Sequence, residues 1–293
     1  MDLSVEEDTS TQSGSLLVIV LDSSPGQRIL SENENVLSQC LDAVMVFCNL
    51  HLMKSPQNQL AVIACYSQNS DFLYPTSNPD QKHDSKTNDG RYELFANVNQ
   101  AIRDNIKNFI LNKSQGVVCS ESLMAGALCK ALCYINRIEK QHQIGQNISS
   151  RILIITPCND YKSQYMNFMN VFFTAQKQNV VIDACMLDGD SGLVQQGCDL
   201  THGIYLKIPH LSGFLQYLLW LYLPEPHLRK YLALPPPVKV DFRAACFCHR
   251  DLIEIGYVCS VCLSIFCNFS PICSTCQTVF KFLGPPAKKK KNK

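Results

Sequence analysis

The sequence lacks a membrane-spanning run and the beginning of a secretory signal. No stretch reaches the roughly 18 consecutive apolar residues that a transmembrane helix requires. Residues 1–8 are acidic, whereas a secretory signal begins with a basic segment. Charged residues are few, 17% against 46% hydrophobic, which excludes wholesale disorder and favours a folded core. We therefore expect a soluble intracellular protein, and 293 residues suffice for about two domains.

Motifs of the common enzyme classes are also missing. The sequence contains no phosphate-binding loop ending in Lys-Ser/Thr, no Gly-x-Gly-x-x-Gly, no His-Glu-x-x-His and no Gly-x-Ser-x-Gly elbow. Its seven histidines are isolated, which is more typical of surface or core positions than of general bases. We expect a protein that is not an enzyme.

An excess of basic residues is lacking once the C-terminus is set aside. The chain carries 26 basic and 25 acidic residues, and five lysines lie within residues 288–293. Without them the chain is acidic by about four charges. Surfaces that bind nucleic acid usually carry a basic excess, because neutralising phosphates supplies most of the non-specific affinity. We expect no extensive direct DNA binding, and the lysine run indicates a nuclear localisation signal or a solvated tail.

Strand-like and helical segments alternate over residues 14–223. Apolar runs typical of strands buried on both faces lie at 16–21, 60–65, 151–155, 180–186 and 204–208. Apolar residues recur at helical spacing in the segments 31–53, 95–109, 123–135, 165–172, 191–198 and 211–223. The polar stretch 67–90 is predicted to be a loop. The alternation predicts an α/β domain with a mostly parallel sheet and helices on both faces.

Proline marks the end of this domain. Pro224, Pro226 and the run 235–237 predict a stiff linker, because proline can neither continue a helix nor donate to a sheet. The expected division is a disordered N-terminus at 1–13, the α/β domain at 14–223, the linker at 224–241, a cysteine-rich module at 242–282 and a basic tail at 283–293. No internal repeat is evident.

Seven of the sixteen cysteines lie between residues 246 and 276, and four of them follow the pattern of a zinc finger. Cys259-x2-Cys262 and Cys273-x2-Cys276 are separated by ten residues. Each pair offers two thiolates to one tetrahedral ion, which makes four unligated core cysteines the less favoured alternative. A module this small has little core, so structural Zn²⁺ would supply much of its folding energy. Four protein ligands leave no open position for catalysis.

A second group of potential ligands surrounds the first. It consists of Cys246, Cys248, His249 and Cys267. The spacing Cys246-x-Cys248 is less regular, and Cys267 has no close partner in the sequence, so these residues are expected to pack the module unless they hold a second zinc.

The end of the first apolar run carries part of a cation-binding motif. Open α/β sheets bind ligands beyond the carboxyl ends of their strands. Von Willebrand factor A domains place Mg²⁺ there with an Asp-x-Ser-x-Ser motif and a Thr and an Asp from other loops. Asp22 and Ser24 match the first two positions, but Gly26 occupies the third and cannot ligate. Candidates for the later positions are Ser120, Ser122 and Asp160. A turn that caps the next helix is the favoured interpretation.

Several segments resemble the family of subunit 3 of the general transcription factor IIH core. They are Tyr165–Asn170, Ala175–Asn179, Ile182–Cys185 and, most specifically, Phe242–Cys246 through Gly256–Cys262. The resemblance covers nearly the whole chain. It implies a von Willebrand A-like domain followed by a C4 zinc finger, with zinc held by Cys259, Cys262, Cys273 and Cys276.

The same resemblance implies a non-enzymatic scaffold subunit of a nuclear complex that opens promoters and performs nucleotide excision repair. In this family the A-type domain pairs with the zinc-bearing module of another A-type core subunit, while helicase and translocase subunits do the ATP-driven work. The implied partners are the other core subunits, with DNA reached only through the complex, and with no membrane and no small-molecule substrate.

The sequence departs from the family in three places, which bear on how tightly this chain would bind its partner. They are the loop Ser23–Arg28, the polar stretch Thr76–Asn88 and His202-Gly203, where the family tends to have paired glycines. A left-handed backbone at Thr201–His202 would cost about 1–2 kcal/mol.

Two other function classes fit the sequence less well. A RING-like ubiquitin ligase component would need a cross-braced ligand set with a central histidine, and the sequence offers only His249, placed early. A metal-dependent adhesion-type domain would need the complete Asp-x-Ser-x-Ser motif and usually an oxidising compartment. Zinc stoichiometry and a Mg²⁺ titration discriminate among these functions.

Overall fold

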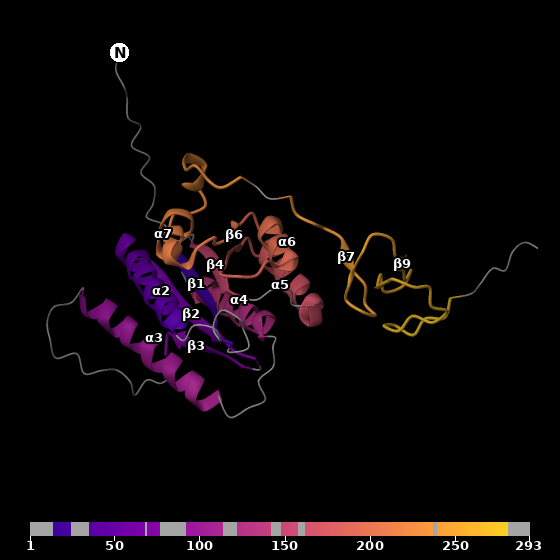
Figure 1. Cartoon of the computed structure of the whole chain (residues 1–293), viewed down its shortest axis with the longest axis horizontal. Coiled ribbons are helices and arrows are strands. Elements are labelled where there is room, and N and C mark those ends of the chain that lie inside the picture. Colours follow the sequence, from indigo (N-terminus) through magenta and orange to yellow (C-terminus); the bar gives the residue numbers. More distant parts are fainter. Residues whose placement is uncertain are drawn as a thin grey trace, which may run out of the picture. The chain divides into compact units, whose positions relative to one another are not determined.

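The structure is a computed structural model that describes residues 14–24, 35–67, 69–76, 92–113, 122–141, 148–157, 162–236 and 239–280. These residues belong to two compact units, one ending at Val240 and the other beginning at Asp241 (Figure 1). The predicted N-terminal and C-terminal tails, 1–13 and 283–293, lie outside the described residues. So do most of the Ser23–Arg28 loop and the Thr76–Asn88 stretch.

A six-stranded sheet forms the centre of the first unit. Its strand order is β3-β2-β1-β4-β5-β6, and every neighbouring pair is parallel except β2 and β3. The strands are β1 Ser15–Asp22, β2 Gln59–Cys65, β3 Ser70–Tyr74, β4 Ser149–Thr156, β5 Val181–Met186 and β6 Tyr205–Lys207. The predicted fold class, an α/β domain with a mostly parallel sheet, is confirmed.

The prediction that residues 67–90 are entirely a loop is wrong, because they contain strand β3. A tight turn, in which the Tyr66 N–H donates to the Asn69 carbonyl at 2.8 Å, returns the chain antiparallel to β2. Only Ser70 and Leu73 of this strand are fully buried. An edge strand with so few buried apolar residues carries little of the periodic signal on which a sequence prediction depends.

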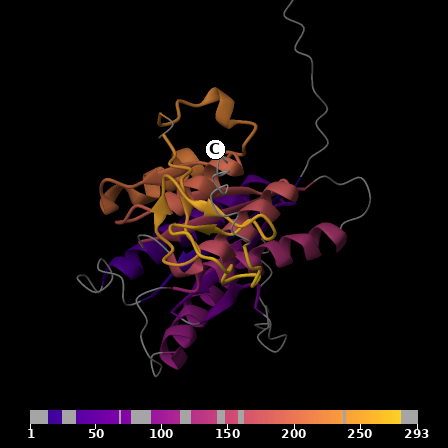
Figure 2. The same cartoon turned by 90° about the vertical axis from the view of Figure 1, so that its right-hand side faces the viewer.

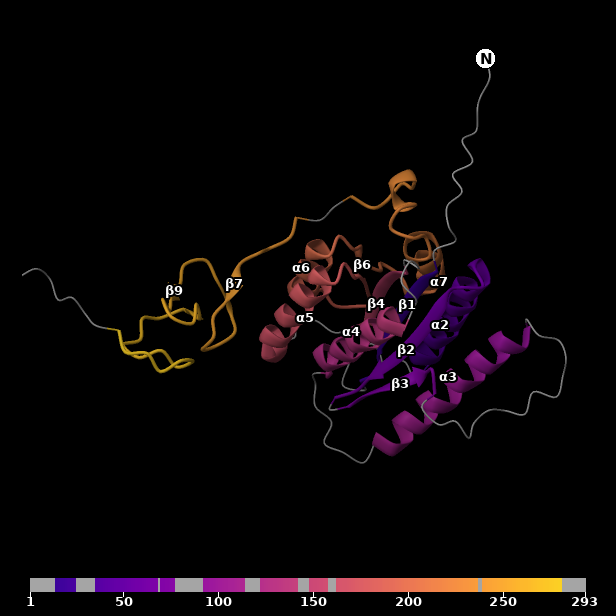
Figure 3. The ribbon, with the colours of Figure 1, turned by 180° about the vertical axis from the view of Figure 1, so that it is seen from behind.

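Helices cover both faces of the sheet, as predicted, and each face has its own core. Figure 3 shows α4, α5 and α6 on one side of the strands and α2, α3 and α7 on the other. Leu16, Val18 and Val20 of β1 pack into the first core, and the residues between them pack into the second. The helices are α2 Asn35–Lys54, α3 Tyr92–Lys113, α4 Met124–Gln141, α5 Tyr165–Lys177, α6 Gly192–Leu200 and α7 Phe214–Tyr217, which a π-helical turn continues over Leu218–Tyr222.

Helix α2 is long and apolar enough to cross a membrane by length and composition alone, with a mean hydropathy of 1.5 over Val36–Lys54. In the structure one stripe of this helix, including Cys40, Val44 and Phe47, is buried in the core between α2 and the sheet. Packing on the sheet accounts for this stripe, but 39% of the window is buried, and Val46 and Met53 remain exposed.

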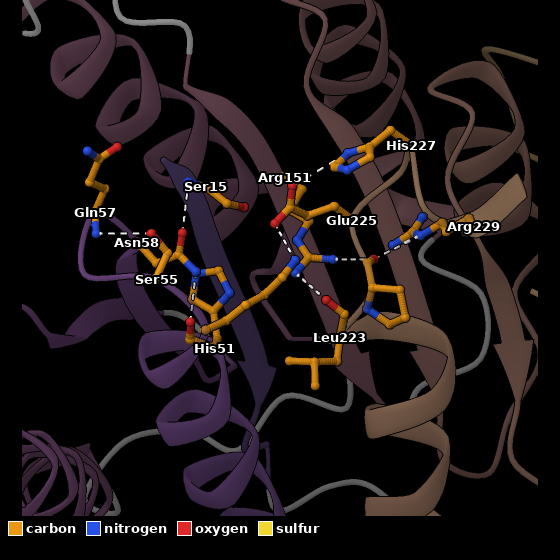
Figure 4. Close-up of polar contacts among 12 residues, drawn as sticks. Ser15, His51, Ser55, Gln57, Asn58, Arg151, Leu223, Glu225, His227 and Arg229 are labelled. Atoms are coloured by element: carbon orange, nitrogen blue, oxygen red, sulfur yellow. Dashed lines mark hydrogen bonds and ion pairs between the residues drawn. The ribbon is translucent and has the colours of Figure 1, made fainter. Parts of the chain in front are cut away.

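Two buried arginines hold the chain that follows α7 (Figure 4). The Arg151 guanidinium, on β4, donates to the carbonyl oxygens of Tyr222, Leu223 and Pro224 at 2.6–3.2 Å. Arg229 donates to both carboxylate oxygens of Asp183, on β5, at 2.8 and 2.5 Å. Residues 224–229, the start of the predicted linker, are therefore held against the first unit.

A buried histidine lies near Arg151. The Asn58 side chain accepts from the Ser15 N–H at 3.0 Å and donates to the His51 carbonyl at 2.8 Å (Figure 4). Nε2 of His51 lies 3.2 Å from the Gln59 carbonyl oxygen. Burial, and then the charge of Arg151, lower the pKa of His51 to about 4.

We expect His51 to destabilise the first unit as the pH falls from 6.5 to about 4. In this window the unfolded chain binds a proton at the histidine and the folded chain does not, so acid favours unfolding. The full effect is about 3 kcal/mol. Urea unfolding at several pH values should give a shallower pH dependence for His51→Gln than for the original chain. If both proteins showed the same pH dependence of unfolding, His51 would not be the group responsible, because all other titrating groups are the same in both.

The turn after α6 needs a left-handed residue, and the chain places a histidine there. His202 has φ 59°, directly after the C-cap Thr201. Gly203 cannot be replaced easily, because an added Cβ would lie 1.9 Å from the Ile182 carbonyl oxygen. The backbone strain considered for this departure from the family is therefore present at His202 itself.

We expect His202→Gly to stabilise the first unit by about 0.5–1 kcal/mol, since glycine avoids the left-handed penalty but adds freedom to the unfolded chain. The side chain is exposed, so little packing is lost. Thermal unfolding should show a higher Tm for His202→Gly and a lower one for Gly203→Ala. A lower Tm for both would mean that the histidine makes stabilising contacts.

Candidate metal centres

The second unit consists of short hairpins and turns, drawn in yellow in Figure 2. Strands β7 Ala244–Ala245 and β8 Leu252–Ile253 form the first hairpin, and β9 Tyr257–Val258 and β10 Ile265–Phe266 form the second. An isolated bridge joins Ile272 to Val279. Among the residues that the structure describes in this unit, the buried apolar cluster consists of Cys259, Phe266 and Cys273 with a few partly buried neighbours, and Ala245 and Cys246 are buried beside the first hairpin's turn. A core of this size needs another source of stability.

The four cysteines predicted as a C4 set lie together. Cys259 and Cys262 occupy the turn between β9 and β10, and Cys273 and Cys276 occupy the turn inside the Ile272–Val279 bridge. All four sulfurs lie within 4.8 Å of one another. The Cys259–Cys276 and Cys262–Cys273 sulfur pairs are 3.7 and 3.6 Å apart. Tetrahedral zinc with Zn–S bonds of about 2.3 Å separates its sulfurs by about 3.8 Å, so this spacing fits the ion.

Two hydroxyl groups support the thiolate form that a metal requires. The Ser264 hydroxyl lies 3.1 Å from Sγ of Cys262, and the Thr278 hydroxyl lies 3.1 Å from Sγ of Cys276. These hydrogen bonds lower the pKa of Cys262 to about 6 and that of Cys276 below its usual range. Hydrogen bonds of this kind orient and tune metal ligands.

The second group of potential ligands also converges. The ligand atoms of Cys246, Cys248, His249 and Cys267 lie within 4.8 Å of one another. Sγ of Cys267 is 3.3 Å from Sγ of Cys248 and 3.2 Å from Nδ1 of His249. The fold thus supplies the partners that Cys267 lacks in the sequence. The expectation that these residues pack the module unless they hold a second zinc did not use the spacing Cys246-x2-His249, which has the same gap as the two Cys-x2-Cys pairs.

The partial cation motif at the end of β1 forms a hydrogen-bonded cluster. The Asp22 carboxylate accepts from the Ser24 N–H at 3.1 Å and from the hydroxyls of Ser122 and Thr156 at 2.8 and 2.9 Å. Burial raises the pKa of Asp22. Among the described residues at this edge of the sheet, the Asp22 carboxylate therefore accepts hydrogen bonds from the protein's own backbone and side chains. Thr156 was missed, although it directly follows the apolar run 151–155. Gly26, Ser120 and Asp160 lie outside the described residues.

Known proteins resemble this chain over most of its length. The model of a family described as transcription factor Tfb4 matches residues 14–277. A Schizosaccharomyces pombe protein named general transcription and DNA repair factor IIH subunit tfb4 is 38% identical over 289 residues, which are 98% of this chain and 94% of that protein. General transcription factor IIH subunit 3 of Dictyostelium discoideum is 38% identical over 270 residues, 87% of this chain and 72% of that protein.

The fold also matches a solved structure. The crystal structure of the TFIIH p34 N-terminal domain covers 70% of this chain and 96% of its own, with 26% sequence identity and a TM-score of 0.59.

Proposed function

Because the chain belongs to the transcription factor Tfb4 family, we propose that it is a non-catalytic scaffold subunit of the transcription factor IIH core, acting in RNA polymerase II transcription initiation and nucleotide excision repair in the nucleus. The observation that carries the proposal is the 38% identity that spans 98% of this chain and 94% of the Schizosaccharomyces pombe subunit. A likeness from end to end extends to both units, and not to the sheet alone.

The proposed work of the chain is protein–protein contact with other core subunits, chiefly the second A-type, zinc-bearing subunit. The supporting feature is a set of large apolar side chains that are exposed to solvent and not buried in the chain's cores. On the second unit they include Ile255, Tyr257, Val258, Val261, Leu263, Ile272 and Val279. Exposed apolar groups in such density are typical of surfaces that an assembly covers. Contact with DNA would be indirect, through the complex.

We propose that the C4 zinc finger, residues 242–282, holds structural Zn²⁺ at Cys259, Cys262, Cys273 and Cys276. The sulfur spacing and the two hydroxyl groups beside the thiols support this assignment. When bound, the ion would crosslink the two turns and supply folding energy to a unit with a small core. The protein's own contribution is to pre-arrange the four sulfurs and, through the hydroxyls of Ser264 and Thr278, to favour deprotonation of Cys262 and Cys276.

The test is co-purification of the full chain with the second A-type subunit. A stoichiometric complex would support the scaffold role, and its loss in Cys259→Ala/Cys262→Ala would assign part of the contact to the C4 unit. Cys129→Ala/Cys133→Ala, at exposed positions on α4, is the matched control and should leave the complex intact. A folded, zinc-loaded chain that forms no complex would overturn the proposal.

One observation favours the alternative, a RING-like ubiquitin ligase component. The two ligand groups alternate along the chain, because Cys267 lies between the two pairs of the C4 set but joins Cys246, Cys248 and His249. A RING module also interleaves the ligands of its two ions, but it does so in four consecutive pairs with a central histidine, whereas here three, two, one and two ligands follow one another. Ubiquitin transfer in a reconstituted assay, lost on removing the C4 ligands, would support this function.

A further inference from the structure

The second unit builds the same hairpin three times, a repetition not evident in the sequence. In each hairpin, the residue before a cysteine pairs with the residue seven positions later, as in Ala245–Leu252, Val258–Ile265 and Ile272–Val279. The N–H of that cysteine donates at 2.9 Å to the carbonyl five residues on, in the pairs Cys246–Asp251, Cys259–Ser264 and Cys273–Thr278. The three turns therefore share one backbone geometry.

Each turn also contains a left-handed residue at the same position. The fourth residue after the cysteine has φ 64°, 60° and 59° at Arg250, Leu263 and Gln277, and its N–H donates to the cysteine's carbonyl at 2.9 Å. None of these residues is glycine, so each pays a steric penalty of about 1–2 kcal/mol. Such strain persists only where the surrounding structure imposes it. In the second and third turns, the proposed zinc ligands provide that constraint.

The first turn carries ligand-type side chains at the same two positions. In the other turns the potential ligands are the first and fourth residues, Cys259 with Cys262 and Cys273 with Cys276. The corresponding residues of the first turn are Cys246 and His249, and the His249 N–H points to Sγ of Cys246 at 3.4 Å. By position, then, Cys246 and His249 form a third ligand pair.

The fold brings two more cysteines to this pair. The Phe247 N–H donates to the Ile265 carbonyl at 2.8 Å, which joins the first hairpin to β10. Cys248 follows Phe247, and Cys267 follows β10, so this one hydrogen bond sets the two thiols side by side. Three sulfurs and the Nδ1 of His249 then face a common point, within 4.8 Å of one another.

We propose that Cys246, Cys248, His249 and Cys267 bind a second structural zinc ion. Three thiolates and one imidazole are a common ligand set of structural Zn²⁺. Together with the C4 set, this site makes the unit a binuclear, cross-braced module. The second ion would join residues 246–249 to Cys267 across Cys259 and Cys262, and the C4 ion would join Cys259 and Cys262 to residues 273–276 across Cys267. The inference goes beyond the C4 site and does not depend on the chain's place in a transcription complex.

The first test counts zinc in the full-length chain by elemental mass spectrometry after gel filtration in the presence of a weak chelator. We expect two zinc ions per chain, and one in Cys248→Ser/Cys267→Ser. Cys129→Ser/Cys133→Ser, the matched control, should keep two. One ion in the original chain would overturn the second site and keep the C4 site, while no zinc in a folded chain would overturn both. Two ions in Cys248→Ser/Cys267→Ser would place the second ion elsewhere.

A second variant stays informative if loss of ligands unfolds the module. His249→Cys replaces an imidazole by a thiolate and keeps four ligands, so it should retain two metal ions. In the cobalt-substituted chain, thiolate-to-cobalt absorption grows with the number of Co–S bonds. The two sets contain four and three cysteines, seven in all. His249→Cys raises the number of thiolate ligands to eight, so this absorption should rise by about one seventh. An unchanged cobalt spectrum would overturn the assignment of His249.

Discussion

Replacing Cys259 and Cys262 by serine should unfold the second unit and leave the first unit folded. The reason is that the apolar cluster in the described part of the second unit is small, Cys259, Phe266 and Cys273, whereas each face of the sheet has an extensive core of its own. Zinc binding to comparable fingers contributes about 10–16 kcal/mol, and this energy is folding energy. Limited proteolysis should show rapid cleavage within residues 241–280 and a resistant fragment containing the sheet.

The same result is expected when a strong chelator is added to the original chain, because it removes the C4 ion together with the ion proposed at the second ligand set. Cys129→Ser/Cys133→Ser changes the same number of cysteines on α4 and should leave the proteolytic pattern unchanged. If the Cys259→Ser/Cys262→Ser protein held no zinc at all and kept its protease resistance, the small core alone would be sufficient, and zinc would have no structural role.

Replacing Arg229 by methionine should destabilise the first unit by about 3–5 kcal/mol. The substitution keeps much of the side-chain volume but leaves the buried Asp183 carboxylate without its bidentate partner. One hydrogen bond to Asp183, from the Ile204 N–H at 2.8 Å, would remain. Urea unfolding of the original chain and of Arg229→Met measures the difference. The released chain near Pro224 should also become more sensitive to proteases.

A double variant separates the ion pair from simple packing. In Arg229→Met/Asp183→Asn no unpaired charge is buried, and the amide oxygen can still accept from Ile204, so we expect recovery of much of the lost stability. Arg243→Met removes an exposed arginine paired with Asp241 in the second unit and should leave the stability of the first unit unchanged. Equal destabilisation in the single and double variants would mean that the loss comes from packing and not from the stranded charge.

The sequence predicted the sheet well because burial on both faces makes its central strands apolar throughout. Runs such as 16–21 and 151–155 needed no knowledge of their neighbours to be recognised as strands. Strand β3 was missed because only Ser70 and Leu73 of it are buried. The helix at 211–223 was placed correctly, but its change to a π-helical turn at Leu218 has no sequence signal that we recognise.

Ion pairs and clusters joined across the sequence could not be predicted. Arg229 and Asp183 are 46 residues apart, and each alone resembles an ordinary surface charge. Thr156 joins Asp22 from 134 residues away, because the carboxyl ends of β1 and β4 meet at one edge of the sheet. Such contacts follow from strand order, which local patterns do not contain.

In the candidate metal centres, too, some ligands could be predicted from local spacing and others only from the fold. The sequence by itself determined the two Cys-x2-Cys turns, because two ligands of one tetrahedral ion within a tight turn require a fixed short spacing. Only the tertiary structure decided that Cys267 joins Cys246, Cys248 and His249, since the hydrogen bond from Phe247 to Ile265 brings them together across the ligands of the other set. Local spacing is set by backbone geometry and can be read along the chain, whereas the meeting of distant ligands depends on how the hairpins pair.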